Sequence, residues 1–184
     1  MSLLTSFATP PVLQTPRLTL VPHGPEHIDD VMVALADGDA MRLTGTRGSF
    51  TREQVLAHLH RIAKADDRAD FAILDEAENY IGEVVLNELD EDNLAVNYRI
   101  ALSGTSTRGR GYGTEAGRAA VEWAFGTAGV HRISLDVYSF NPAAQRSYEK
   151  IGFRVEGRAR HTLFWDGEWV DSILMAMLAT DPRP

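Results

Sequence analysis

The chain has 184 residues, 44% hydrophobic and 24% charged, which is typical of a soluble globular domain. Its 26 acidic and 18 basic residues give a formal net charge of −8, which disfavours binding to nucleic acid or membrane surfaces and mildly favours a cationic substrate. There is no cysteine, no apolar run of about 20 residues and no signal-peptide pattern, so disulfides and thiolate chemistry are excluded and we expect a cytoplasmic protein.

Hydrophobic periodicity divides the chain into alternating strands and helices. Residues 1–11 show no such pattern and are expected to form a disordered tail. Thr51 and Gln54 have the spacing of a capping box, which marks a helix start. The expected elements of the first half are a strand at 17–21, a helix over 28–35, a glycine-containing loop at 38–50, a helix opened by Thr51, and an antiparallel meander of strands at 71–74, 80–89 and 94–100.

A glycine-rich loop joins the last strand of this meander to a helix. It has glycines at positions 109, 111 and 113 and arginines at 108 and 110. Ala116, Ala119, Ala120 and Trp123 then follow at the spacing of one helical face. Free backbone N–H groups at a helix start attract phosphate, and glycines let the backbone approach it. The loop therefore predicts a phosphate or pyrophosphate site, and the alternative is a flexible loop with solvated arginines.

The second half continues with a strand at 132–138 and a helix opened by Asn141 and Pro142, which are preferred N-cap and first-turn residues. Asp166 and Gly167 then form the turn of a hairpin at 164–169, before a closing strand at 172–178. A strand, a crossover helix and a strand imply one parallel pair. We therefore expect an α/β fold with a mixed, mostly antiparallel sheet and one parallel strand pair, flanked by helices.

The glycines also match a dinucleotide fingerprint, because residues 111–116 fit G-x-G-x-x-A and Asp136 follows about 20 residues later, where a ribose-binding acid belongs. A dinucleotide-binding oxidoreductase is therefore an alternative. Two features count against it: the loop is detached from its strand, and too little chain follows to complete such a domain.

Two motifs in succession resemble those of the GNAT acetyltransferase superfamily. Arg108-x-x-Gly111-x-Gly113 is similar to its acyl-CoA pyrophosphate motif, and the segment from Asn141 to Phe153 is similar to the segment that follows in that superfamily. The stretches 13–18 and 166–171 resemble the RimJ/RimL branch, which acetylates N-termini of ribosomal proteins; spermidine acetyltransferases share the second stretch. The resemblance covers roughly residues 12–178 and implies a single acetyltransferase domain at 12–180.

The resemblance implies transfer of an acetyl group from acetyl-CoA to an amine. It implies Tyr148 as the general acid, which suits a phenol that is protonated at neutral pH; a core aromatic is the alternative. Asp136 is the expected base, with Glu83 and Glu88 as alternatives acting through water. The expected acetyl-CoA-binding residues are Ile100, Ala101, Leu102, Arg108, Gly109, Arg110, Gly111, Tyr112, Gly113, Thr114, Asn141, Ala144 and Tyr148.

The acceptor is expected to be a protein N-terminus or a polyamine, bound by the loops at 38–50 and 161–171. An α-amine, with a pKa of about 8, needs little base at pH 7, whereas a lysine-type amine at about 10.4 needs more. The six histidines form no ligand cluster, so no metal is expected. A homodimer and a non-catalytic acyl-CoA-binding module remain open.

Overall fold

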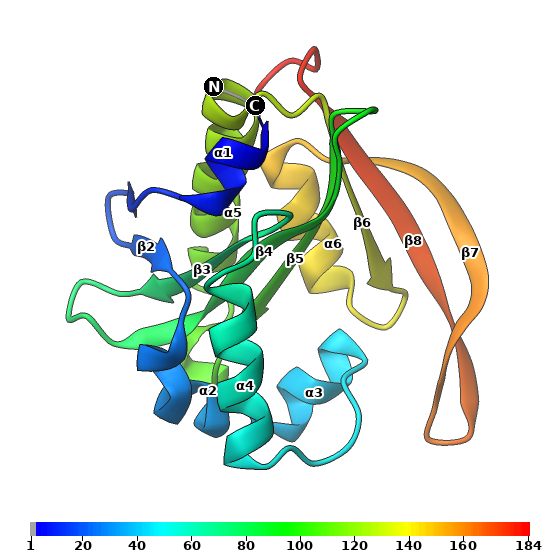
Figure 1. The fold of residues 1–184 in the computed structure, drawn as a ribbon. Coiled ribbons are helices and arrows are strands. Elements are labelled where there is room, and N and C mark those ends of the chain that lie inside the picture. Colours follow the sequence, from blue (N-terminus) through cyan, green and yellow to red (C-terminus); the bar gives the residue numbers. More distant parts are fainter. Residues whose placement is uncertain (1–2) are drawn as a thin grey trace.

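The computed structural model describes residues 3–184, which form one eight-stranded sheet with helices packed against it (Figure 1). The strands are β1 (Leu13–Gln14), β2 (Thr19–Pro22), β3 (Ala69–Leu74), β4 (Tyr80–Asp90), β5 (Ala95–Leu102), β6 (Arg132–Tyr138), β7 (Arg154–Trp165) and β8 (Glu168–Leu178). Their order across the sheet is β1-β2-β3-β4-β5-β6-β8-β7, and only β5 and β6 run parallel. The expected mixed, mostly antiparallel sheet is confirmed.

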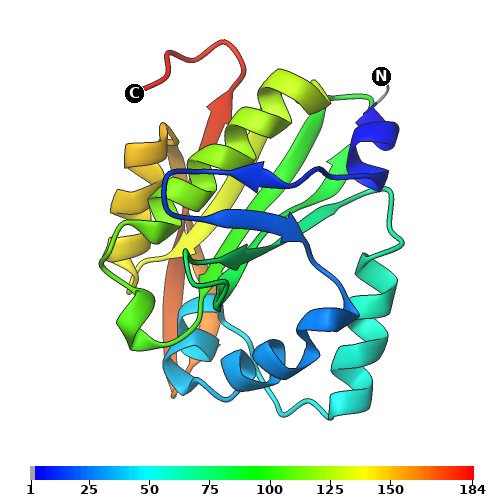
Figure 2. The ribbon, with the colours of Figure 1, turned by 90° about the vertical axis from the view of Figure 1, so that its left-hand side faces the viewer.

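The helices form two groups. In Figures 1 and 2, α2, α3 and α4 lie together below the sheet, whereas α5 runs along the sheet beside α6. No helix within residues 3–184 combines the length and the apolarity needed to cross a bilayer. The helices are α1 (Leu3–Ala8), α2 (Ile28–Leu35), α3 (Gly38–Thr44), α4 (Arg52–Ile62), α5 (Tyr112–Trp123) and α6 (Pro142–Ile151), with two short 3-10 helices, η1 (Pro25–His27) and η2 (Thr105–Thr107), and a π-helix, η3 (Ala124–Ala128).

The main core lies between the sheet and α5. Phe71 of β3 packs edge-on against Trp123 of α5 with ring centroids 5.5 Å apart, and Phe7 packs on the same indole at 5.3 Å. All three side chains are buried. A second, smaller cluster joins α2 to α4 through Ile28 and Leu59. The two clusters explain why the helices separate into two groups.

Local signals predicted several element boundaries correctly. The capping box of Thr51 and Gln54 starts α4, and the Asn141 side chain accepts a hydrogen bond from the N–H of Ala144 at the start of α6. Asp166 and Gly167 both have positive φ, as a two-residue hairpin turn between twisted strands requires. These features depend on neighbouring residues, which is why the sequence alone predicts them.

Three expectations need correction. Residues 1–2 of the expected disordered tail lie outside the described residues, but residues 3–8 form α1, because Phe7 is buried against the core. The expected loop at 38–50 contains α3, which Asp37 caps by accepting the N–H groups of Asp39 and Ala40. The hairpin is also much longer than expected, because β7 begins at Arg154 and pairs along most of β8.

Gly117 is a position on α5 where neighbouring side chains leave no room for a Cβ. A Cβ placed there would lie 2.5 Å from Ile151 Cδ1 and 2.6 Å from Tyr98 Oη, and both of these side chains are buried. Gly117→Ala is therefore expected to lower the free energy of unfolding by about 1–2 kcal/mol, because overpacking outweighs the gain of about 1 kcal/mol in helix propensity. Urea denaturation measures this change.

The matched control is Gly126→Ala in η3, where no atom lies within 4 Å of an added Cβ. We expect this variant to be as stable as the original chain or slightly more stable. Equal stability changes in the two variants would contradict the packing explanation.

Candidate active site

The site lies where the two parallel strands separate. β5 and β6 are paired only at three positions, from Ala95 opposite Arg132 to Asn97 opposite Ser134. Beyond these positions β5 continues on β4 alone and β6 on β8 alone. A cavity of about 420 Å³ occupies the gap, and its walls include residues 97–102 of β5 and 136–138 of β6. Residues of α3, α5 and α6 also line this cavity.

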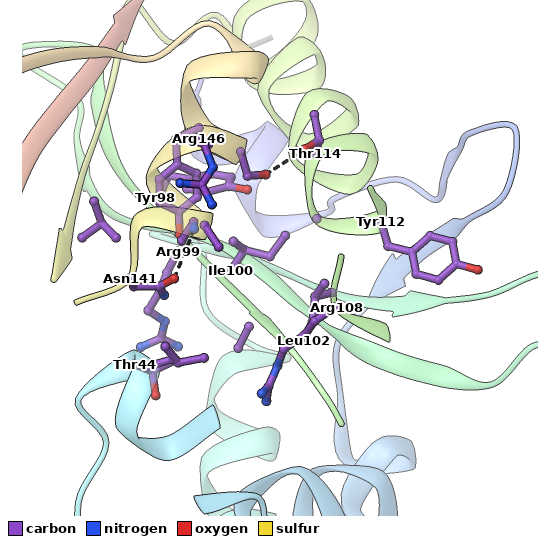
Figure 3. Close-up of a pocket in the computed structure, with 18 of the residues that line it drawn as sticks. Thr44, Tyr98, Arg99, Ile100, Leu102, Arg108, Tyr112, Thr114, Asn141 and Arg146 are labelled. Carbon is purple, nitrogen blue, oxygen red and sulfur yellow. Dashed lines mark hydrogen bonds between the residues drawn. The ribbon is translucent and has the colours of Figure 1, made fainter. Parts of the chain in front are cut away.

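Figure 3 shows this cavity from close by. Thr114 of α5 and Arg146 of α6 lie on one side of it, whereas Thr44 of α3 lies on the opposite side. Almost all the residues predicted to bind the donor or catalyse transfer line the cavity: Ile100, Ala101, Leu102, Arg108, Gly109, Gly111, Tyr112, Gly113, Thr114, Asp136, Asn141, Ala144 and Tyr148. Arg110 does not line it, because it lies on the exposed outer part of the loop.

The glycine-rich loop presents backbone donors to this cavity. Gly109 and Gly111 have φ of 76° and 83°, which other residues adopt only with strain. The Glu115 N–H bonds to the Gly111 carbonyl, so the N–H groups of residues 112–114 precede the hydrogen-bonded part of α5. With the positive end of the helix dipole, these groups form a cradle that suits a pyrophosphate.

Arg108 adds a positive charge to the cavity wall beside the glycine-rich loop, and it forms an ion pair with Asp37. Its Nη2 donates to Oδ2 of Asp37 at 2.7 Å. Burial alone would raise the pKa of Asp37, but the Ala40 N–H and the charge of Arg108 together lower it, so the ion pair stays charged. Sequence reasoning missed Asp37. The only local signal was its position as a helix N-cap.

Two further cations lie beside the cavity. Arg146 and Lys150 line it from α6, four residues apart on one helical face. A sequence reading could have found them from this spacing, because they follow Asn141 on the same helix. Together with Arg108 they give the donor side of the cavity a positive character that suits a ligand carrying several phosphates.

Tyr148 is the buried acid candidate. It is 9% exposed and packs edge-on against Tyr98 with ring centroids 5.9 Å apart. Burial raises the pKa of Tyr148 above its usual value, and the charge of Asp136 raises it further. The phenol therefore stays protonated at neutral pH and can donate a proton. Asp136 and Tyr148 both line the cavity.

The three candidate bases differ in their surroundings. Asp136 lines the cavity from β6, and its Oδ2 accepts a hydrogen bond of 2.8 Å from Ser172 Oγ. Glu83 lies outside the cavity wall, with Oε2 3.4 Å from His23 Nδ1. Burial would raise the pKa of Glu83, but the nearby His23 and Arg99 lower it, which makes Glu83 a weaker base. Glu88 is exposed and also lies outside the wall.

The segments expected to bind the acceptor are α3 and the turn of the β7–β8 hairpin. Ala40, Leu43 and Thr44 of α3 line the cavity together with Arg99 of β5. Beyond Tyr138 a second cavity of about 490 Å³ contacts the hairpin turn, and its lining residues are Arg42, Ser139, Phe140, Trp165, Asp166, Glu168, Trp169 and Val170. Both segments expected to bind the acceptor thus lie next to cavities. Among residues 3–184 no group of three or more potential ligands is placed to hold a metal ion.

Comparisons with known proteins agree with this geometry. A family model described as an acetyltransferase (GNAT) domain matches residues 17–154. The chain belongs to the GNAT acetyltransferase family. Its fold and its relatives support an acetyl-CoA-dependent N-acetyltransferase. The dinucleotide-binding oxidoreductase alternative is therefore wrong.

The relatives differ in what they acetylate. The probable N-acetyltransferase YjcK of Bacillus subtilis is 30% identical over 131 residues, 71% of this chain and 72% of that protein. The spermidine N(1)-acetyltransferase of Vibrio cholerae is 28% identical over 130 residues, 71% of this chain and 73% of that protein. The [ribosomal protein uS5]-alanine N-acetyltransferase of Escherichia coli is 32% identical over 81 residues, 44% of this chain and 42% of that protein.

A solved structure of the spermidine N-acetyltransferase from Vibrio cholerae, in complex with CoA and spermine, has the same fold. It superposes with a TM-score of 0.84 and 21% identity, covering 91% of this chain and 98% of that one. The expected GNAT-like acyl-CoA N-acyltransferase fold is confirmed by this likeness.

Proposed function

We propose that this enzyme transfers the acetyl group of acetyl-CoA to a primary amine by direct attack in a ternary complex. The observation that carries the proposal is the gap between β5 and β6, which has the phosphate-binding cradle on one side and Asp136 with the α3 wall on the other. A donor and an acceptor entering from opposite faces of the sheet would meet there. We further propose membership of the RimJ/RimL-like branch.

Bound acetyl-CoA supplies the acyl thioester, and the residues of the chain handle the protons. In this proposal Asp136 accepts the proton that the attacking amine loses, and its bond to Ser172 Oγ fixes the carboxylate. Tyr148 donates a proton to the departing sulfur. The backbone of residues 100–102 and the Asn141 side chain orient the arm of the donor, and the N–H groups of residues 112–114 bind its pyrophosphate.

The acceptor is proposed to be a protein N-terminal α-amine, with a polyamine as the second candidate. The relatives named for uS5 alanine and for spermidine support the two classes. Arg99 in the acceptor-side wall disfavours a polycation, which supports the α-amine. The proposal includes no metal, nucleic acid or membrane partner. The cytoplasmic location and the homodimer expected from the sequence stay predictions.

Thermal unfolding with CoA, acetyl-CoA, NAD and NADP tests the donor assignment. A ligand at about 100 times its Kd adds about 2.7 kcal/mol and raises the midpoint by several degrees. We expect CoA and acetyl-CoA to raise it and the dinucleotides to leave it unchanged. Release of free CoA is then measured with an alanine-initiated peptide and with spermidine. Binding of CoA without turnover on any amine would favour a non-catalytic module.

The pH dependence of kcat/KM distinguishes the two acceptor classes. For an α-amine we expect a tenfold rise per pH unit that levels near pH 8, whereas for a polyamine the rise continues towards pH 10. The raised pKa of Tyr148 keeps the acid protonated, so no fall in rate is expected between pH 6 and 9. A profile that falls in this range would contradict the assignment of Tyr148.

A further inference from the structure

Arg17, just before β2, joins the N-terminal segment to the glycine-rich loop. Its Nε and Nη2 lie 2.8 and 2.6 Å from Oε2 of Glu115, and its backbone N–H donates to Oε1 at 2.9 Å. Its Nη1 donates to the carbonyl of Arg110 at 3.1 Å, and its guanidinium lies 4.7 Å from the ring centroid of Tyr112. One side chain thus contacts three residues of the donor-binding segment.

Glu115 places a negative charge where an anion is expected to bind. It lies in the first turn of α5, directly after the N–H groups of residues 112–114. Burial would raise the pKa of Glu115, but hydrogen bonds from Thr15 and Arg17, with the charge of Arg17, lower it, so the carboxylate is ionised. Without its partner this charge would repel a pyrophosphate bound one turn away.

We propose that Arg17 is a positioning residue for the donor: by pairing with Glu115 it neutralises the carboxylate that lies beside the N–H groups expected to face the pyrophosphate. The geometry supports this role, because the bond from Arg17 to the carbonyl of Arg110 and the two contacts to Oε2 of Glu115 fix the guanidinium beside the carboxylate. This inference rests on the proposed donor site. It assigns a function to Arg17, which does not itself line the cavity.

Removal of the charges, first of Arg17 and then of both partners, tests the role, with CoA as the probe and isothermal titration calorimetry as the measurement. Arg17→Ala is expected to raise the Kd for CoA about tenfold, because it leaves Glu115 unpaired beside the anion site. The double variant R17A/E115Q removes that charge and is expected to bind within about threefold of the original chain. Arg17→Lys keeps the charge but not the two-nitrogen contact, and an intermediate Kd is expected.

Recovery in the double variant separates this role from simple loss of structure, because removing both partners cannot restore a contact. The matched control is Arg132, whose Nη1 and Nη2 lie 2.9 and 2.6 Å from the two carboxylate oxygens of Glu156. Arg132 does not line the cavity. Arg132→Ala is expected to leave the Kd unchanged. Circular dichroism of each variant without ligand shows that it is folded.

Two results would overturn the role of Arg17 alone: a Kd for Arg17→Ala equal to that of the original chain, or a double variant as weak as Arg17→Ala. If the folded original chain fails to bind CoA, the donor assignment itself fails, and this role falls with it. The original chain is therefore measured first.

Discussion

Replacing Tyr148 by phenylalanine is expected to lower kcat about 100-fold while the KM for acetyl-CoA changes little, because general acid catalysis contributes about 10²–10⁴-fold and acts mainly in the transition state. The ring still fills its place against Tyr98, so packing is preserved. Only the proton donor is lost, and water does not easily replace it at a side chain that is 9% exposed. Steady-state kinetics with the best acceptor measures the change.

The matched control for this variant is Tyr80→Phe, which removes a hydroxyl from another partly enclosed tyrosine. Tyr80 stacks on His23 with ring centroids 5.8 Å apart and lies outside the cavity wall. We expect its kcat and KM to match those of the original enzyme. An unchanged kcat in Tyr148→Phe would show that another group protonates the sulfur and that Tyr148 is a core aromatic.

Replacing Arg68 by methionine is expected to lower the free energy of unfolding by about 3–5 kcal/mol, because it leaves the buried carboxylate of Asp70 without its partner. Arg68 Nε and Nη2 donate to the two carboxylate oxygens of Asp70 at 2.6 and 2.7 Å. The Asp70 side chain is 3% exposed and that of Arg68 12%. The backbone carbonyl of Asp70, in β3, also accepts a hydrogen bond from the N–H of His23, the residue that follows β2. Thermal and urea unfolding measure the loss.

An exposed ion pair provides the control. Arg52 bonds to Asp29 with side chains 52% and 82% exposed, so Arg52→Met is expected to change stability by less than about 0.5 kcal/mol. The double variant R68M/D70L should recover most of the loss, because it removes both charges. A loss below about 1 kcal/mol in Arg68→Met would mean that water reaches Asp70 and that the pair is not effectively buried.

Much of the candidate site could be predicted because its signals are local. The positive φ of Gly109 and Gly111, the Asn141 cap and the Asp166 turn all follow from the conformational preferences of single residues and their neighbours. The parallel pair followed from a strand, a helix and a strand in succession. From these features the sequence predicted that the glycine-rich loop and Tyr148 share one site, and both line the same cavity.

The missed features are those whose cause is distant in the sequence. Phe7 orders α1 by packing on Trp123, more than 100 positions away, so a segment without its own periodicity was expected to be disordered. Asp37 pairs with Arg108 across 71 positions. Asp37 stands directly before the stretch at 38–50, and the glycine that follows it concealed the short helix that Asp37 caps.

The sequence by itself predicted the family and the mixed sheet with its one parallel pair, because these depend on residue types at fixed spacing. The tertiary structure decided which charges meet: Arg17 with Glu115 across 98 positions, and Asp136 rather than Glu83 in the cavity wall. The physical reason is that the interaction of two charges depends on the distance and the medium between them, and only the packed chain sets both.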